Sequence, residues 1–390
     1  MSSGGSRAAA LISSKVPVTK PRNGSSIGRA HLGGGESLTI GQRRRLLRWR
    51  DSTAIAARAG VESGRLRRFR SVARLLPCGL LAVVLAACDA GGRLPVYTPV
   101  GEVPLASAAL RDCLSRYAQQ RGWRRAGEVV ELHCNHPDGG GVERLEGIDR
   151  LPNLRVLNLA HNRIAATEPL WSLQRLEDLD LGYNRITFLE PPSAHLSLLR
   201  LNLDHNAIRR LDWLAQFPRL TNLSLAHNEI RDLRPLATAA ELTDLNLERN
   251  RIDDLAALAQ LGQLRWLDIR GNEVAELAPL ARLAGLKSLI ADDNRIRSVA
   301  ALATLAELDE LSLAGNPLES ADALAGLANL RVLILDRTPL PTVRPLAVLG
   351  NLQRLSIRKL PKVGCEERLA LRRELGADVV QVGAECAGGP

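Results

Sequence analysis

The chain has 390 residues, and its 52 Lys and Arg against 42 Asp and Glu give a formal net charge of +10. A basic excess of this size suggests nucleic-acid binding. Residues 1–88 alone, however, carry 16 basic and three acidic residues, a net +13, which leaves −3 for the remainder. Binding of nucleic acid by the folded part of the chain is therefore not expected.

Residues 1–64 are rich in Gly, Ser and Arg without periodicity, which indicates either disorder or an N-terminal extension wrongly included in the gene. From Arg65 the chain has a basic segment, a 13-residue apolar run from Leu75 to Ala87, and small residues. This order is typical of an export signal, and the run is shorter than the roughly 20 residues that span a bilayer. We predict a signal peptide over residues 65–88.

The end of this segment, Leu85-Ala86-Ala87-Cys88, resembles the lipobox of bacterial lipoproteins. The resemblance implies cleavage before Cys88, diacylation of its sulfur and acylation of the new amino terminus, which together give stable anchoring. The alternative is an ordinary signal peptide whose cysteine is incidental. Asp89 resembles the inner-membrane retention signal of enterobacterial lipoproteins, but that rule varies between lineages. The expected location is the cell envelope, at the periplasmic side of the inner membrane or at the outer membrane.

Residues 89–104 have the Gly and Pro content of a tether, with a root-mean-square reach of about 20 Å. Residues 105–141 follow as an N-terminal cap. Leu110, Leu114 and Tyr117 share one helical face, and a strand-like run extends from Val129 to Cys134. A helix and an edge strand are what the open end of a stacked repeat needs, because an uncovered core and sheet edge invite aggregation.

Residues 142–360 contain one asparagine every 22 residues, each preceded by apolar residues three, five and eight positions upstream. A fixed period in this range indicates a solenoid. Each asparagine amide can donate to and accept from the turning backbone. Thr338 and Leu360 replace the asparagine in the last two coils, which we expect to be less regular. The ladder comprises Asn162, Asn184, Asn206, Asn228, Asn250, Asn272, Asn294 and Asn316.

A single coil shows the local structure. Leu245 and Leu247 alternate with polar residues, which is the pattern of a short strand with one buried face. After Asn250 the apolar spacing becomes three, from Ile252 to Leu261, which suits a helical or 3₁₀ return leg. Stacked coils would place the strands in a parallel sheet with leucine inside.

At these residues, for example LTDLNLERNRI (Leu242 to Ile252), the sequence resembles the leucine-rich repeat family. It resembles specifically the 22-residue class of the internalins and of the phosphatase regulators of the SDS22 type. The resemblance implies an α/β solenoid: a curved horseshoe of about ten coils, with the parallel sheet on its concave face. The family binds its partners on that face.

After the last repeat strand, residues 361–390 predict a C-terminal cap with a helix from Glu366 to Leu375 and a strand from Val379 to Val382. Besides Cys78 in the leader and Cys88, four cysteines remain, two at each end of the repeats. Only the pairs Cys113–Cys134 and Cys365–Cys386 are local, since the ends of the stack lie too far apart to be bridged. Two disulfides imply an oxidising compartment. The alternative is four free thiols in a cytosolic protein.

The strand residues that face the concave side are the candidate partner-binding residues. An exposed tryptophan beside aliphatic residues and ringed by charge has the composition of a binding hot spot. The alternative is that the acids merely solvate the sheet and that Trp266 lies flat on its neighbours. The candidates are Asp178, Asp180, Asp204, Asp244, Trp266, Asp268, Arg270 and Ile290.

No phosphate-binding loop, HExxH or GxSxG motif is present, so we expect neither an enzyme nor a cofactor. His205 and His227 occupy one frame in adjacent coils, where two imidazoles could bind a metal, but a polar rim is the favoured interpretation. We predict a monomeric, membrane-anchored module that binds a protein or peptide. The alternatives are an internalin-like adhesin or secreted effector, and an intracellular phosphatase-regulating scaffold.

Overall fold

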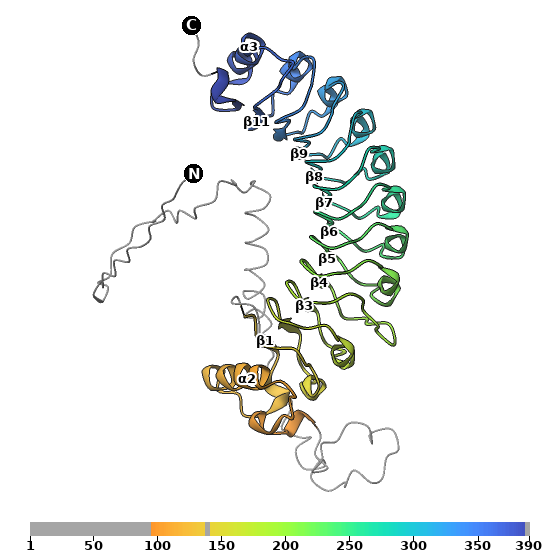
Figure 1. The fold of residues 1–390 in the computed structure, drawn as a ribbon, viewed down its shortest axis with the longest axis vertical. Helices are drawn as coiled ribbons and strands as arrows, with labels where there is room; N and C mark the ends of the chain where they lie inside the picture. Colours follow the sequence, from red (N-terminus) through yellow and green to blue (C-terminus); the bar gives the residue numbers. More distant parts are fainter. Residues whose placement is uncertain (1–94, 137–140, 387–390) are drawn as a thin grey trace, which may run out of the picture. The chain divides into compact units, whose positions relative to one another are not determined.

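The computed structural model describes residues 95–136 and 141–386. Within them, twelve short strands form one parallel sheet, in which each strand is hydrogen-bonded to its neighbours in sequence order (Figure 1). This order without crossovers arises because each coil adds one strand to the stack. The strands are β1 (Glu131–His133), β2 (Val156–Asn158), β3 (Asp178–Asp180), β4 (Arg200–Asn202), β5 (Asn222–Ser224), β6 (Asp244–Asn246), β7 (Trp266–Asp268), β8 (Ser288–Ile290), β9 (Glu310–Ser312), β10 (Val332–Ile334), β11 (Arg354–Ile357) and β12 (Val380–Val382).

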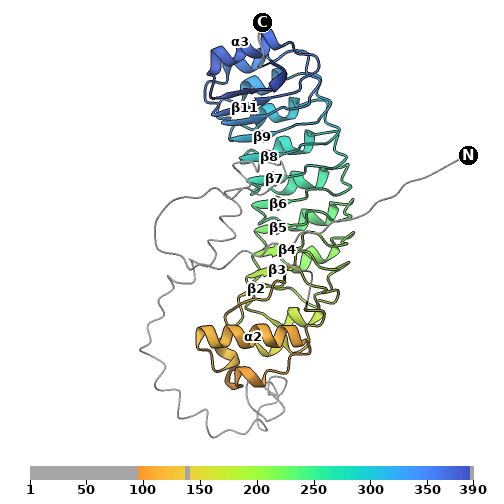
Figure 2. The same ribbon diagram turned by 60° about the vertical axis from the view of Figure 1, so that its left-hand side comes forward.

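The predicted 3₁₀ return legs are confirmed except in the coil of β3, which has no 3₁₀ segment before β4. Figures 1 and 2 show the strands along the inner side of the stacked coils and the short helical segments along the outer side. Leucines between the two layers are fully buried, as Leu245 and Leu258 illustrate. The 3₁₀ segments between successive strands from β1 to β11 are η5 (Ile148–Arg150), η6 (Glu168–Ser172), η7 (Asp212–Gln216), η8 (Arg234–Thr238), η9 (Ala256–Gln260), η10 (Ala278–Arg282), η11 (Ala300–Thr304), η12 (Asp322–Gly326) and η13 (Arg344–Val348).

The asparagine ladder joins each coil to the one before it. The Asn250 amide nitrogen donates to the carbonyl oxygens of Leu247 in its own coil (3.1 Å) and Leu225 in the preceding coil (2.9 Å). Its side-chain oxygen accepts from the backbone N–H of Ile230 (3.0 Å). The same bonds recur from Asn184 to Asn316. The predicted ladder is therefore confirmed as a set of bonds that satisfies buried backbone groups.

The residue before each ladder position has a left-handed backbone in every coil from His161 (φ 58°) to Lys359 (φ 53°). Glycine occupies this position only at Gly271 and Gly315. A side chain in this conformation costs about 1–2 kcal/mol relative to the right-handed region. The hydrogen bonds of the asparagine that follows hold the backbone there.

The irregularity expected in the last two coils is confined to a turn. Strands β10 and β11 pair in the same register as the others, with Val332 opposite Arg354. Thr338 is fully buried and donates its hydroxyl to the carbonyl of Leu335 (2.7 Å). The N–H of Leu318, which an asparagine at 338 would accept, bonds to the carbonyl of Asn316 instead (2.9 Å).

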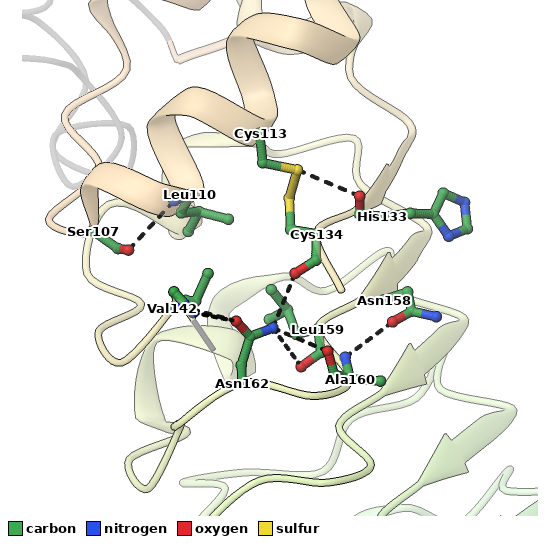
Figure 3. The surroundings of a disulfide bond; sticks show 11 residues. Ser107, Leu110, Cys113, His133, Cys134, Val142, Asn158, Leu159, Ala160 and Asn162 are labelled. Carbon is green, nitrogen blue, oxygen red and sulfur yellow. Dashed lines mark hydrogen bonds between the residues drawn. A yellow bond between two sulfur atoms is a disulfide. The ribbon is translucent and has the colours of Figure 1, made fainter. Parts of the chain in front are cut away.

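The N-terminal cap contains helix α2 (Ala108–Arg121) and strand β1, close to the predicted elements. The helix begins at Ser107, whose hydroxyl oxygen accepts the N–H of Leu110 (3.3 Å). The predicted disulfide between Cys113 and Cys134 joins α2 to the end of β1 (Figure 3). The Asn162 amide donates to the carbonyl of Cys134 (2.9 Å), so the ladder begins at the cap.

Residues 95–104 are not the flexible tether expected from their composition. They form two 3₁₀ turns, η2 (Pro95–Tyr97) and η3 (Val100–Glu102), and Val103 is buried. The Val100 N–H donates to the carbonyl of Arg124 (3.0 Å). The reason is that Val100 and Val103 pack against the core of the cap. Residues 89–94, the predicted signal peptide and Cys88 lie outside the described residues.

The C-terminal cap closes the other end as predicted. Helix α3 (Cys365–Leu375) is joined to segment η14 (Ala384–Cys386) by the Cys365–Cys386 disulfide, and β12 extends the sheet. The buried Arg368 donates to the Glu385 carboxylate (2.7 Å), and this bond is the main cause that lowers the pKa of Glu385 to about 2. Across the described ranges, no helix has the length and apolar character needed to cross a bilayer.

Substituting a ladder asparagine tests the role of its bonds. In Asn250→Ala the buried N–H of Ile230 and two carbonyls lose their partner, which should lower the free energy of unfolding by about 2–4 kcal/mol. Asn250→Thr should lower the free energy of unfolding by less, because a threonine hydroxyl can donate to the carbonyl three residues back, as Thr338 does. Guanidinium denaturation followed by circular dichroism measures both. If both variants lowered the free energy of unfolding equally, the side-chain hydrogen bonds would not be the source of the stabilisation.

Candidate partner-binding face

On the side of the sheet opposite to the leucine core, the side chains of the strands face solvent. In β5, Leu223 is buried while Asn222 and Ser224 on either side of it are half-exposed. We call this side the strand face. It comprises the first and third residues of each strand and the residue two positions after the third. The parallel register places equivalent residues of successive coils in columns.

The apolar centre expected on this face is absent at the predicted residues. Trp266 keeps only 9 % of its surface exposed, and Ile290 keeps none, so the prediction of an exposed tryptophan is wrong. Trp266 lies in register between Asp244 and Ser288 on the adjacent strands. Because parallel strands are only about 4.8 Å apart, a large side chain loses much of its surface to its neighbours.

Several predicted acidic residues are engaged in bonds within the face. Asp178 is 5 % exposed and pairs with Arg200, whose Nε lies 2.8 Å from the carboxylate. Asp268 is 1 % exposed and accepts from Nε of Arg270 (3.0 Å). Asp244 also accepts a side-chain bond, from the amide of Asn222 (2.7 Å). These three carboxylates are therefore bonded to other side chains of the strand face.

Side-chain oxygens of aspartate and asparagine bind the backbone where many of the strands end. Asp180 accepts the N–H of Gly182 in its own coil (3.0 Å). Asp204 reaches forward and accepts the N–H of Ala226 (2.7 Å) and the hydroxyl of Ser224 (2.6 Å) in the next coil. The own-coil bond is made by Asn158, Asp180, Asn202, Asn246 and Asp268. The forward bond, always to a coil with serine, is made by Asp204, Asp292 and Asp336.

Burial raises the pKa of Asp180, Asp204 and Asp292 to about 6 in each case, although backbone hydrogen bonds oppose it at all three and serine hydroxyls oppose it at Asp204 and Asp292. A buried carboxylate is penalised in its charged form. The strand face is accordingly less acidic near pH 6 than its composition suggests.

Four rings form a continuous stack in the column that precedes the asparagine ladder. The ring centroids of His161 and Tyr183 are 4.1 Å apart, those of Tyr183 and His205 4.0 Å, and those of His205 and His227 3.9 Å. The interplanar angles are 12–16°. We call these four residues the ring column. The two inner rings, Tyr183 and His205, are covered on both faces, so solvent reaches their edges, and Tyr183 is 46 % exposed.

Two imidazoles of the ring column, those of His205 and His227, favour the neutral form. Burial, followed by the neighbouring His227, lowers the pKa of His205 to about 4, and burial lowers the pKa of His227. In the part of the chain that the structure describes, no group of three or more His, Cys, Asp or Glu is placed to hold a metal. The frame shared by the four rings is visible in the sequence, but the left-handed backbone that aligns them is not.

Models of the leucine-rich repeat match residues 174–230 and 218–274, and a two-copy leucine-rich repeat model matches residues 152–195. No protein with a curated description matches the sequence. Among solved structures, an internalin (InlF) of Listeria monocytogenes is similar at 20 % identity and a TM-score of 0.59, covering 74 % of this chain and 97 % of its own. The structure of a TLR13–ssRNA13 complex matches at 25 % identity and a TM-score of 0.50, covering 61 % of this chain and 37 % of its own. The fold is thus a leucine-rich-repeat solenoid.

The raised pKa of Asp204 predicts a pH-dependent stability. Its ordinary pKa is about 3.9, so the folded chain binds the proton more tightly than the unfolded chain, and stability present below pH 4 is lost as the pH rises through about 6. In Asp204→Asn the side-chain oxygen can keep both bonds without a buried charge. The free energy of unfolding of the variant should exceed that of wild type by about 2–3 kcal/mol at pH 7.5. At pH 4 the two free energies should be equal. Denaturant midpoints at both pH values measure this, and a constant difference would contradict it.

Proposed function

We propose that this chain is a membrane-anchored leucine-rich-repeat module that binds a protein or peptide on its strand face at the bacterial cell envelope. The observation that supports this most is the uninterrupted parallel sheet from β1 to β12, which leaves one open face. The ten repeat strands at about 4.8 Å spacing extend about 45 Å. That is wide enough for an interface of standard size, about 800 Å² per partner.

The rigidity of the face also supports binding. Asp178 and Arg200 hold each other in one geometry, and Asp204 is fixed by Ser224 and by the N–H of Ala226. Side chains held in this way lose little conformational entropy when a partner binds. Leucine-rich-repeat proteins are typically scaffolds that bind proteins.

Two observations support the proposed membrane anchor: the sequence around Cys88 and the two disulfides. The lipobox-like Leu85-Ala86-Ala87-Cys88 lies outside the described residues. The Cα atoms of Cys113 and Cys134 are 5.7 Å apart and those of Cys365 and Cys386 5.2 Å, which suits disulfides. Disulfides persist in oxidising compartments, which favours export and disfavours an intracellular phosphatase-regulating scaffold.

A nucleic-acid ligand and a glycan ligand are both less favoured than a protein. The strand face carries Asp244 and Glu310, which accept hydrogen bonds from the neutral side chains of Asn222 and Ser288 and would repel phosphates. Sugar rings pack on the faces of aromatic rings, but in the ring column both faces of Tyr183 and of His205 are covered by neighbouring rings. An internalin-like adhesin remains the second candidate, because the fold of InlF is similar.

Mass spectrometry of the mature chain tests the anchor. In a bacterial host, the wild-type chain should begin at Cys88, carry the acyl mass and partition into membranes. Cys88→Ala should lose the acyl mass and the partitioning. A control variant, Cys78→Ala, removes the other leader cysteine and should behave as wild type. An unmodified wild-type chain that begins at Met1 would overturn the anchor.

Site-specific photo-cross-linking tests the binding face. A photoreactive phenylalanine analogue at Asn222, on the strand face, should form adducts with envelope proteins of the native host. The same residue at Gln260, exposed at the end of η9 on the outer side, serves as the matched control and should not. Adducts from Gln260 alone, or from neither position, would contradict binding at the strand face.

A further inference from the structure

Charge is unevenly distributed along the strand face. We count the residues of the strand face together with the left-handed residue that precedes each ladder position. At these positions the nine coils from β2 to β10 carry ten acidic and four basic residues. The coil of β11 instead carries three cations, Arg354, Arg358 and Lys359, and no acid. The face therefore changes sign at its C-terminal end.

Two of the three cations at this end are not neutralised within the described residues, whereas Arg358 forms an ion pair with Asp336. No ion pair joins Arg354 or Lys359 to a carboxylate of the described ranges. Arg354 lies opposite Val332 on β10. Its aliphatic stem can therefore lie along an apolar neighbour while its guanidinium stays available.

Arg358 and the nearby acids are differently engaged. Arg358 donates to the side-chain oxygen of Gln381 and lies 3.8 Å from the Asp336 carboxylate. Asp336 already accepts the Ser356 hydroxyl (2.7 Å) and the Arg358 N–H (2.8 Å). Glu385 accepts from the backbone N–H of Lys359 (3.0 Å) and from the guanidinium of Arg368. The charge of Glu385 is therefore neutralised by Arg368 in the cap.

A shallow hollow continues this cationic end beyond the last strand. It is lined by Arg358, Arg372 and Gln381 together with β12 and the chain up to Ala384. Two guanidinium groups therefore border one recess that is open to solvent. Guanidinium groups form paired hydrogen bonds with carboxylates.

We propose that Arg354, Arg358 and Lys359, with Arg372 in the adjoining hollow, bind a short carboxylate-rich peptide segment of the partner. This inference rests on the proposed function and specifies which part of the partner lies at which end of the strand face. The segment must be short, because the coils that precede β11 carry Glu310, Asp293 and Asp292. A nucleic acid carries a charge at every nucleotide, so a long one would extend from the cations over these acids.

The test uses the full chain and a fluorescein-labelled 12-residue peptide with four consecutive glutamates in a Gly-Ser background. Fluorescence anisotropy should show binding of this peptide and none of the matched peptide with glutamines. The affinity should fall as salt increases from 20 to 500 mM, because exposed charges are screened. The double variant Arg354→Glu/Lys359→Glu should weaken binding at least tenfold, and Arg354→Gln/Lys359→Gln should weaken it less.

The matched control is Arg282→Glu/Lys287→Glu, which makes the same change in net charge at residues away from β11 and should leave the affinity within twofold. Circular dichroism establishes that each variant is folded. Equal binding of the glutamine peptide, or an unchanged affinity in the Arg354→Glu/Lys359→Glu variant, would overturn the proposal. Tighter binding of a single-stranded 12-nucleotide RNA through the same residues would overturn it in favour of a nucleic acid. If peptide binding fails while cross-linking from Asn222 persists, only this subsite is wrong; if both fail, the proposed function is wrong.

Discussion

The structure depends on one recurrent constraint: the chain must turn, in every coil, at a place where its backbone polar groups are buried. The turn uses a left-handed residue, which costs energy for any side chain other than glycine, and the asparagine that follows it offsets this cost. One amide satisfies carbonyls in two coils and an N–H in the earlier one, as at Asn250. The 22-residue period is fixed because a shift of one residue would break these bonds in both coils at once.

The same periodicity determines the chemistry of the surface. Residues in one frame are held about 4.8 Å apart along the sheet, so each side chain interacts first with its equivalents in the adjacent coils. The ring column is one result, because Tyr183 lies between two imidazoles and all three backbones have the same conformation. The forward bond from Asp204 to the coil of Ser224 is another. These contacts between coils make the face rigid and use much of its polarity internally.

The sequence was sufficient for features that repeat or are local. The strand frame, the 3₁₀ legs, Asn162 to Asn316 and the Cys113–Cys134 pairing all follow from spacing, and the structure confirms them. Features that depend on neighbours in adjacent coils were not predictable. Trp266 was expected to be exposed from its column alone, but its burial depends on the residues beside it. The packing of residues 95–104 was missed because Val100 and Val103 have no periodic partner in sequence and find their contacts only in the folded cap.

The cationic end of the strand face follows from where the repeat stops. Within the stack, Asp336 binds the backbone N–H of Arg358 in the next coil, so the position two residues after each strand often serves the neighbour. Arg358 occupies the equivalent position in the last repeat coil, where Leu360 replaces the asparagine, and the next strand, β12, belongs to a cap with a different sequence. At that position the Arg358 side chain donates to the side chain of Gln381 on β12 and does not bind a backbone N–H of the next coil. Recognition chemistry can therefore be placed at the end of the ladder without weakening it, which is where Arg354, Arg358 and Lys359 lie.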